Sequence, residues 1–217
     1  MRRIGLVIFD LDGTLVDSAP DIAAALGATL AEAGLPSPAL ERVKSMVGDG
    51  ARVLIRRALA EAGVAADEDS LLARFVEHYR QGLCIGSRLY PGVSEALDRL
   101  EAAAIPAAVV TNKPGDLARR LLEQLGVAAR LIAVIGDGDG YPRKPDPAAA
   151  RAVLTKAGVA ATRTAVVGDG LPDVQLARAL GARAVAAGWG YVSIERLRAE
   201  APDALAGDPL AAVAALL

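Results

Sequence analysis

The stretch GLVIFDLDGTLVDS, residues Gly5–Ser18, decides how the rest of this sequence is interpreted. A run of apolar and small residues ends in two carboxylates, Asp10 and Asp12, which are followed at once by Gly13 and Thr14. A continuous apolar run indicates a strand that is covered on both faces, as in a parallel sheet. Because the interior of such a strand has no place for paired acids, the two carboxylates predict a functional site where the strand ends.

Four later apolar runs have the same continuous character as the first. They lie at residues 107–110, 131–135, 164–168 and 183–187. Helical patterns, most of them with proline near the first turn or glycine at the end, lie at residues 92–104, 114–126, 146–158 and 172–181. Alternating strands and helices form right-handed βαβ units. The sequence therefore predicts an α/β fold: an open, parallel, Rossmann-like sheet with helices on both faces.

One long segment between the first strand and the next strand–helix unit has no strand-like run. Helical patterns fill it instead, after Ser18 and at residues 38–46, 50–63 and 68–83. We therefore predict a small helical domain at residues 17–87, inserted into an α/β core domain made of residues 1–16 and 88–217.

The composition excludes several classes of protein. The chain has 217 residues, a formal net charge of −2 and one cysteine, Cys84, so it forms no internal disulfide. The charge does not indicate a nucleic-acid or anionic-membrane surface, and no apolar stretch approaches the ~20 residues that span a bilayer. The first residues lack the length and cleavage site of a signal peptide. We expect a cytoplasmic protein without nucleic-acid or membrane partners, and the sequence leaves its oligomeric state open.

Polar residues follow four of the predicted strands at the point where each strand ends. They are Asp10 and Asp12, then Thr111, Asn112 and Lys113, then Lys144, and finally Asp169 and Asp173. Ligands of open α/β sheets bind beyond the carboxyl ends of the strands, so we expect these side chains to converge. Carboxylates suit Mg²⁺, whereas lysine with a hydroxyl and backbone amides suits phosphate.

The electrostatics of this set favour an ion and a phosphate together. A carboxylate about 4 Å from one phosphate charge is repelled by about 4 kcal/mol at an effective dielectric constant of about 20. A metal ion and a lysine would offset that repulsion. The chain has twenty arginines but only four lysines, so a lysine at a strand end is expected to serve chemistry. The pattern therefore predicts attack by an acid on a phosphoryl group.

Four motifs, FDLDGTLVDS, VVTNKP, RKPDP and VVGDGLPD, resemble in this order the signatures of the haloacid dehalogenase superfamily. The resemblance spans nearly the whole chain and is to phosphatases that carry a helical cap after the first strand. The segments TNKP, YPGV and WGY are most similar to the phosphoglycolate phosphatase group. The resemblance implies Mg²⁺-dependent hydrolysis of a small phosphorylated metabolite, such as 2-phosphoglycolate, through an aspartyl-phosphate intermediate.

The resemblance also implies roles for single residues. Asp10 would attack the phosphorus atom, and Asp12 would protonate the leaving oxygen and later activate water. The phosphate would be bound by Thr111, Asn112 and Lys144. The Mg²⁺ ligands would be Asp10, the backbone carbonyl of Asp12, and Asp169, with support from Asp173. Relatives often carry Ser or Thr where this chain has Gly170, which removes a hydroxyl beside the metal site.

Several alternatives stay open at the level of sequence. A sugar-phosphate or pyrophosphate hydrolase of the same superfamily would use the same chemistry. A phosphoacceptor signalling module also combines strand-end acids with Thr and Lys, although such modules are shorter and lack the helical insert. Taken singly, each acid fits a turn or a helix start, and Asn112 and Lys113 fit a purely structural role in their loop.

The helical insert is expected to close over the site, with hinges around Thr14–Ser18 and Ile85–Tyr90. Its loop at residues 47–52 is the candidate to reach the substrate, because two glycines permit a tight turn into a helix. Arg52 would then bind a substrate carboxylate with its planar, permanently charged fork. The alternative is a loop between two helices, with Arg52 in solvent.

Other polar or reactive side chains are expected to have structural roles. Asp17 and Asp21 stand where acids cap the first helix of the insert. His78 and Cys84 lack the neighbours in sequence that would indicate catalysis. Trp189, between two glycines, is expected to pack rather than to bind substrate.

Overall fold

The computed structural model describes residues 3–217, and its core is a six-stranded sheet in the order β5–β4–β1–β6–β7–β8. These strands are β1 (Leu6–Phe9), β4 (Ala107–Pro114), β5 (Leu131–Asp137), β6 (Thr164–Gly168), β7 (Arg183–Ala187) and β8 (Ala204–Ala206). Every neighbouring pair is parallel. The predicted open, parallel α/β sheet is confirmed. Residues 1 and 2 of the predicted core segment 1–16 lie outside the described residues.

Strand β1 lies in the middle of the sheet, between β4 and β6. Its side chains alternate between two hydrophobic cores. Val7 and Phe9 belong to one buried cluster, and Leu6 and Ile8 belong to the other. Both faces of the strand are therefore covered, which is why it reads in the sequence as a continuous apolar run.

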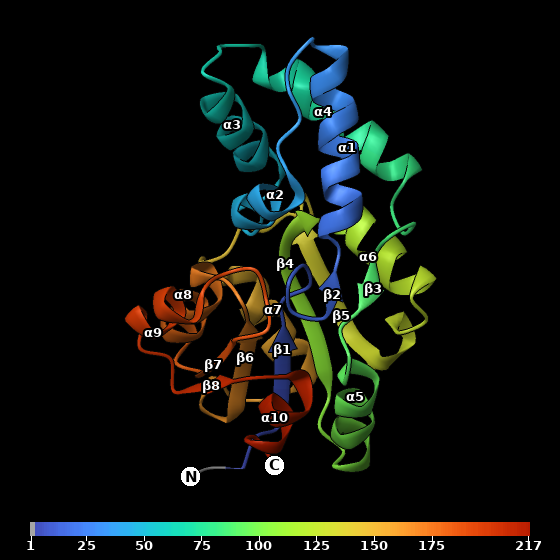
Figure 1. Cartoon of the computed structure of the whole chain (residues 1–217). Helices are drawn as coiled ribbons and strands as arrows, with labels where there is room; N and C mark the ends of the chain where they lie inside the picture. Colours follow the sequence, from blue (N-terminus) through green and yellow to red (C-terminus); the bar gives the residue numbers. More distant parts are fainter. Residues whose placement is uncertain (1–2) are drawn as a thin grey trace.

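Helices cover both faces of this sheet (Figure 1). They are α5 (Val93–Ala102), α6 (Gly115–Gln124), α7 (Ala148–Ala157), α8 (Leu171–Leu180), α9 (Ile194–Ala199) and α10 (Pro209–Ala214). Two short 3₁₀ helices, η1 (Ala128–Arg130) and η2 (Ala161–Arg163), precede β5 and β6. Helices α5, α6 and α10 pack into the cluster of Val7, whereas α7 and α8 pack into the cluster of Leu6. Within residues 3–217, no helix has the length and apolar character needed to cross a bilayer.

The structure extends the predicted core in two places. The sequence pattern does not predict β8, α9 or α10, because elements of three and six residues are too short to show a period. Strand β4 continues past its predicted end at residue 110, because Pro114 still pairs with Asp137 of β5. This continuation brings Thr111, Asn112 and Lys113 into the strand itself.

Four helices lie beyond the carboxyl ends of the core strands, in the upper part of Figure 1. They are α1 (Ala19–Glu32), α2 (Leu40–Met46), α3 (Ala51–Ala62) and α4 (Glu68–Gln81). The chain enters and leaves this helical insert through a two-stranded antiparallel sheet, β2 (Val16–Asp17) and β3 (Arg88–Leu89). The Asp67 carboxylate accepts hydrogen bonds from the first amides of α4, and Gly63 ends α3 in the left-handed conformation.

Asp21 joins the two connections of the insert to each other. It lies in the first turn of α1, where an acid is favourable, but its carboxylate is buried and does not cap that helix. It accepts hydrogen bonds from the backbone amides of Gly86 and Ser87, at 2.7 and 2.8 Å, and from the Ser87 hydroxyl at 2.6 Å. The predicted capping role is therefore wrong for Asp21, because folding places the second connection beside the start of α1.

The start of α1 is capped instead by a residue far along the chain. The Tyr191 hydroxyl accepts hydrogen bonds from the amides of Ser18 and Ala19, at 2.9 and 3.0 Å. It donates to the Asp17 carboxylate at 3.0 Å, so the predicted capping role is also wrong for Asp17. A side chain about 170 residues away satisfies amides that would otherwise lack partners.

Candidate active site

The carboxyl ends of the central strands bring the predicted site residues to one edge of the sheet. Asp10 directly follows β1, residues 111–113 lie in the last part of β4, and Asp169 directly follows β6. Lys144 comes from the loop after β5, and Asp173 comes from the first turn of α8. All of these residues are buried. The convergence that we expected from the strand ends is found.

Three carboxylates, of Asp10, Asp169 and Asp173, form the most acidic part of this edge. Each offers one oxygen, and these oxygens lie within 4.8 Å of one another. The Lys144 ammonium lies 2.7 Å from Oδ1 of Asp10 and 2.7 Å from Oδ1 of Asp173. Oδ1 of Asp10 is buried without a properly oriented hydrogen bond, so its contact with Lys144 is an ion pair only. A buried cluster of hard oxygen donors fits a divalent ion such as Mg²⁺.

The charges of this cluster are not balanced by protein groups alone. Burial, with the nearby charges of Asp10 and Asp173, raises the pKa of Asp169 to about 8. Burial also raises the pKa of Asp173, although the Lys144 ammonium counteracts part of that effect. Burial alone would lower the pKa of Lys144, but the two carboxylates beside it outweigh burial and raise it. The lysine therefore stays protonated, and the acids retain an excess of negative charge that a cation would neutralise.

Backbone and side-chain donors hold the Asp169 carboxylate in place. The Thr14 hydroxyl donates to Oδ1 at 3.0 Å, and the amide of Tyr191 donates to Oδ2 at 2.8 Å. The backbone of Gly13, at a φ of +86°, and that of Gly190 approach this carboxylate so closely that a β-carbon on either would overlap it. The DGT and WGY segments therefore meet at Asp169, and glycine is required at both approaches.

Lys144 is fixed by its backbone as well as by its ammonium. Oδ1 of Asn112 accepts a hydrogen bond from the Lys144 amide at 2.8 Å, and Nδ2 of Asn112 donates to the Lys144 carbonyl at 3.4 Å. The same Nδ2 donates to the carbonyl of Gly48 in the insert at 3.1 Å. Asp173 accepts a further hydrogen bond from the amide of Gly170 at 3.0 Å. Asn112 thus joins two loops of the site, and Asp173 is held even though residue 170 has no hydroxyl.

A second charged network surrounds Asp12. The Lys113 ammonium lies 2.9 and 3.2 Å from the two oxygens of the Asp12 carboxylate. It also donates to the hydroxyl of Tyr79 in α4, at 2.5 Å. The Ser18 hydroxyl donates to Oδ1 of Asp12 at 2.6 Å. Lys113, for which the sequence left a structural role open, therefore belongs to the site and pairs with its second acid.

A pocket opens between this edge and the insert. The core lines it with Asp10, Asp12, Thr111, Asn112, Lys113, Pro114 and Leu117. The insert lines it with Ile22, Val47, Gly48, Gly50, Ala51, Leu54, Phe75 and Tyr79. Most insert side chains in this wall are apolar. The predicted loop at residues 47–52 thus reaches the site, but it contributes backbone and small apolar groups.

Arg52 lies away from this pocket. Its guanidinium donates to the carboxylate of Asp69 at the start of α4, with a 2.6 Å separation, and its side chain is 39% exposed. The expectation that Arg52 faces the substrate is therefore contradicted. The sequence places Arg52 at the start of α3, but only the packing of α3 against α4 decides toward which neighbour its side chain turns.

Known proteins resemble this chain over most of its length. The haloacid dehalogenase-like hydrolase family model matches residues 7–187. The chain belongs to this family. The phosphoglycolate phosphatase of Agrobacterium fabrum is 41% identical over 215 residues, covering 97% of this chain and 91% of the relative. That of Chromobacterium violaceum is 40% identical over 205 residues, covering 92% of each.

A solved structure supports the same family assignment. A predicted phosphoglycolate phosphatase from Haemophilus somnus 129PT has a TM-score of 0.88 and 32% sequence identity. The match covers 97% of this chain and 96% of that one. This haloacid dehalogenase-like hydrolase is therefore a phosphatase, an enzyme that hydrolyses phosphoesters. The alternative of a phosphoacceptor signalling module is excluded.

Some residues around this hydrolase site carry no recognisable signal in the sequence. Tyr79 reads only as part of an amphipathic helix, and its contact with Lys113 depends on how α4 lies over β4.

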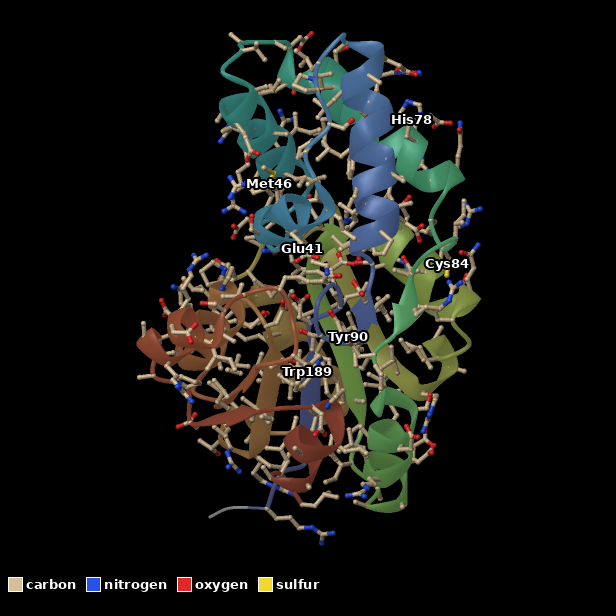
Figure 2. All side chains as sticks on the ribbon, viewed as in Figure 1. Glu41, Met46, His78, Cys84, Tyr90 and Trp189 are labelled. Carbon is tan, nitrogen blue, oxygen red and sulfur yellow. The ribbon has the colours of Figure 1, made fainter. Side chains whose placement is uncertain are left out.

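Three other side chains named in the sequence analysis lie outside the chemistry of the site. The indole of Trp189 donates a hydrogen bond to the Thr14 carbonyl at 2.9 Å, which fits a packing role. Figure 2 shows His78 and Cys84 on the outer side of the molecule, away from the strand ends, whereas Trp189 lies near its centre. His78 contacts Glu32, at 3.0 Å, and takes no part in the site.

Proposed function

We propose that this phosphatase hydrolyses a small phosphomonoester of the 2-phosphoglycolate type and uses Mg²⁺. The observation that carries the proposal is the buried cluster of Asp10, Asp169 and Asp173, with Lys144 against Asp10 and a pocket opening beside it. The substrate class comes from the relatives of Chromobacterium violaceum and Agrobacterium fabrum, which bear the name phosphoglycolate phosphatase.

In this proposal Asp10 is the nucleophile. One oxygen of its carboxylate forms a bond to phosphorus while the bond from phosphorus to the ester oxygen breaks. Asp12, two residues further on, gives its proton to the departing oxygen. Asp12 then takes a proton from a water molecule, whose oxygen attacks phosphorus and releases phosphate from Asp10. The Ser18 and Lys113 contacts fix the Asp12 carboxylate for both steps.

The other residues of the site would bind the metal ion and the phosphate. Asp10, Asp169 and the backbone carbonyl of Asp12 would hold Mg²⁺, with Asp173 placing Lys144. When bound, the ion would supply positive charge to the phosphoryl oxygens. Lys144, Thr111 and Asn112 would form the phosphate site. Asn112 would do so mainly by fixing the backbone of Lys144.

Residues 17–87 would act as a cap over this chemistry. The pocket is lined by the core on one side and by this segment on the other, which is the arrangement a closing lid requires. Hinges around Thr14–Ser18 and Ile85–Tyr90 would let the cap admit substrate and then exclude water. A cytoplasmic location and a small-metabolite substrate without nucleic-acid or membrane partners complete the proposal.

A substrate panel tests this function directly. The purified protein is incubated with Mg²⁺ and 2-phosphoglycolate, hexose phosphates, pyrophosphate or p-nitrophenyl phosphate, and phosphate release is measured. We expect the highest kcat/KM for 2-phosphoglycolate and loss of activity on chelation, restored by added Mg²⁺. A clear preference for a hexose phosphate or pyrophosphate would reject the substrate class, and full activity after exhaustive chelation would reject the metal.

A further inference from the structure

Lys113 has a distinctive place in the pocket between core and cap. Among the described residues that line this pocket, it alone carries a positive charge. The side chains that face it from the insert are largely apolar, including Ile22, Leu54 and Phe75. An anionic group entering this pocket beyond the phosphate site would therefore meet one ammonium among the lining side chains.

We propose that Lys113 binds the carboxylate of the substrate and so selects carboxylated phosphomonoesters, an inference that rests on the proposed function. The ammonium has three N–H donors. The two oxygens of Asp12, at 2.9 and 3.2 Å, belong to one carboxylate and lie on one side of the ammonium, so one N–H can point between them, and a second points to the Tyr79 hydroxyl, at 2.5 Å. The third remains for a ligand.

The spacing between Lys113 and Asp12 matches the substrate. Asp12 must come within about 2.6–3.2 Å of the ester oxygen in order to protonate it. The Lys113 ammonium is already in contact with the same carboxylate. It therefore reaches a group attached one carbon beyond the ester oxygen, and in 2-phosphoglycolate that group is the carboxylate.

The surroundings of Lys113 hold it for this contact. Its side chain is 2% exposed, and its ammonium lies 4.3 Å from the centre of the Tyr79 ring. Burial and the nearby Asp12 charge raise the pKa of Tyr79 well above its usual value, so its hydroxyl stays protonated. The hydroxyl accepts from Lys113 and keeps a hydrogen that a substrate carboxylate could also accept. Because Tyr79 belongs to α4, the carboxylate site is complete only with the cap in this position.

Three substrates separate carboxylate binding from an effect on Asp12. Ethyl phosphate has a methyl group in place of the carboxylate of 2-phosphoglycolate, and both have leaving groups that need an acid. The p-nitrophenolate leaving group needs little help, so p-nitrophenyl phosphate depends on neither the acid nor the carboxylate contact. Lys113→Met removes the charge at similar side-chain length. Lys156→Met, at an exposed position of α7, is the matched control.

Lys113→Met should lower kcat/KM for 2-phosphoglycolate about 10- to 100-fold more than for ethyl phosphate, the loss typical of a charge-assisted hydrogen bond. Lys156→Met should leave all three substrates at wild-type rates. Equal losses on 2-phosphoglycolate and ethyl phosphate would reduce Lys113 to a positioning residue for Asp12 and overturn the proposal. A wild-type enzyme that prefers ethyl phosphate to 2-phosphoglycolate would instead reject the proposed function, and the inference with it.

A second variant keeps the test decisive if Lys113→Met does not fold. Tyr79→Phe preserves the ring and removes only the hydroxyl that holds the ammonium. It should raise KM for 2-phosphoglycolate about threefold or more while changing KM for ethyl phosphate much less. No selective effect in this variant, with thermal unfolding like the wild type, would also overturn the proposal.

Discussion

Two buried lysines lie beside the two acids of the first motif, and they differ in what holds them. The side chains of Lys144 and Lys113 are each only 2% exposed. Lys144 contacts Asp10 and Asp173, which both belong to the core. Lys113 contacts Asp12 of the core and the Tyr79 hydroxyl of the insert.

This difference indicates that the two lysines contact different parts of the substrate. The position of Lys144 is set by core groups, including the backbone contacts from Asn112. The surroundings of Lys113 are complete only while α4 lies over β4. We therefore expect Lys144 to serve the phosphate that every substrate shares. We expect Lys113 to serve the part of the substrate that differs from one phosphomonoester to the next.

Removing the charge of Lys144 should have the largest effect. Lys144→Met should lower turnover of every phosphomonoester by about 1,000-fold, because charge stabilisation at the phosphoryl group is lost. Without metal, its free energy of unfolding should fall by about 3 kcal/mol, because the buried carboxyl groups of Asp10 and Asp173 lose the ammonium that pairs with them. Steady-state kinetics and urea unfolding measure both. If Lys113→Met reduced p-nitrophenyl phosphate turnover as strongly as Lys144→Met, the two lysines would not differ in the way proposed.

Asp12→Asn tests the acid that Lys113 accompanies. The kcat/KM value for ethyl phosphate should fall about 100-fold more than that for p-nitrophenyl phosphate, because only the alkyl leaving group needs a proton. The ratio of the two kcat/KM values gives the result, since kcat/KM does not include the later hydrolysis of the aspartyl-phosphate that both substrates share. Asp12 would lose its role as the acid if kcat/KM fell by the same factor for both substrates.

The acidic edge should make stability depend on pH and on metal. The pKa of Asp169 is about 8 in the fold, against 3.8 ordinarily, so between these values the folded state keeps a proton that the unfolded state has released. Stability of the metal-free protein should therefore fall as pH rises through this window, by up to about 1.4 kcal/mol per pH unit per group, and level off above it. Mg²⁺ should stabilise the protein, most strongly near pH 8. Urea unfolding with chelator and with Mg²⁺ measures this; a metal-free protein that gains stability toward pH 8 would contradict it.

The smallest effect is expected where the core holds the start of the insert. Tyr191→Phe removes the hydroxyl that binds the Ser18 and Ala19 amides and Asp17. It should cost about 1 kcal/mol of stability. It should also raise KM for 2-phosphoglycolate about threefold, more than for p-nitrophenyl phosphate, because a displaced α1 also shifts Tyr79. Tyr141→Phe, at an exposed position, is the control, and an equal KM change on both substrates would separate Tyr191 from the carboxylate site.

The fold and the acidic edge were predictable because they depend on local patterns. Strands buried on both faces must be continuously apolar, and the carboxyl ends of parallel strands must meet at one edge. The convergence of Asp10, Asp169 and Lys144 follows from these two constraints. The sixth strand and the last two helices were not predictable, because segments of three to six residues show no period.

The sequence by itself therefore determined the parallel sheet, the helical insert and the set of residues at the strand ends. Only the tertiary structure decided which charges pair: Lys113 with Asp12, Lys144 with Asp10, and Arg52 with Asp69 instead of the pocket. The physical reason is that strand direction fixes where a side chain begins. Its partner depends on how helices from distant parts of the chain pack, and a rotation of one helix brings a different neighbour into reach.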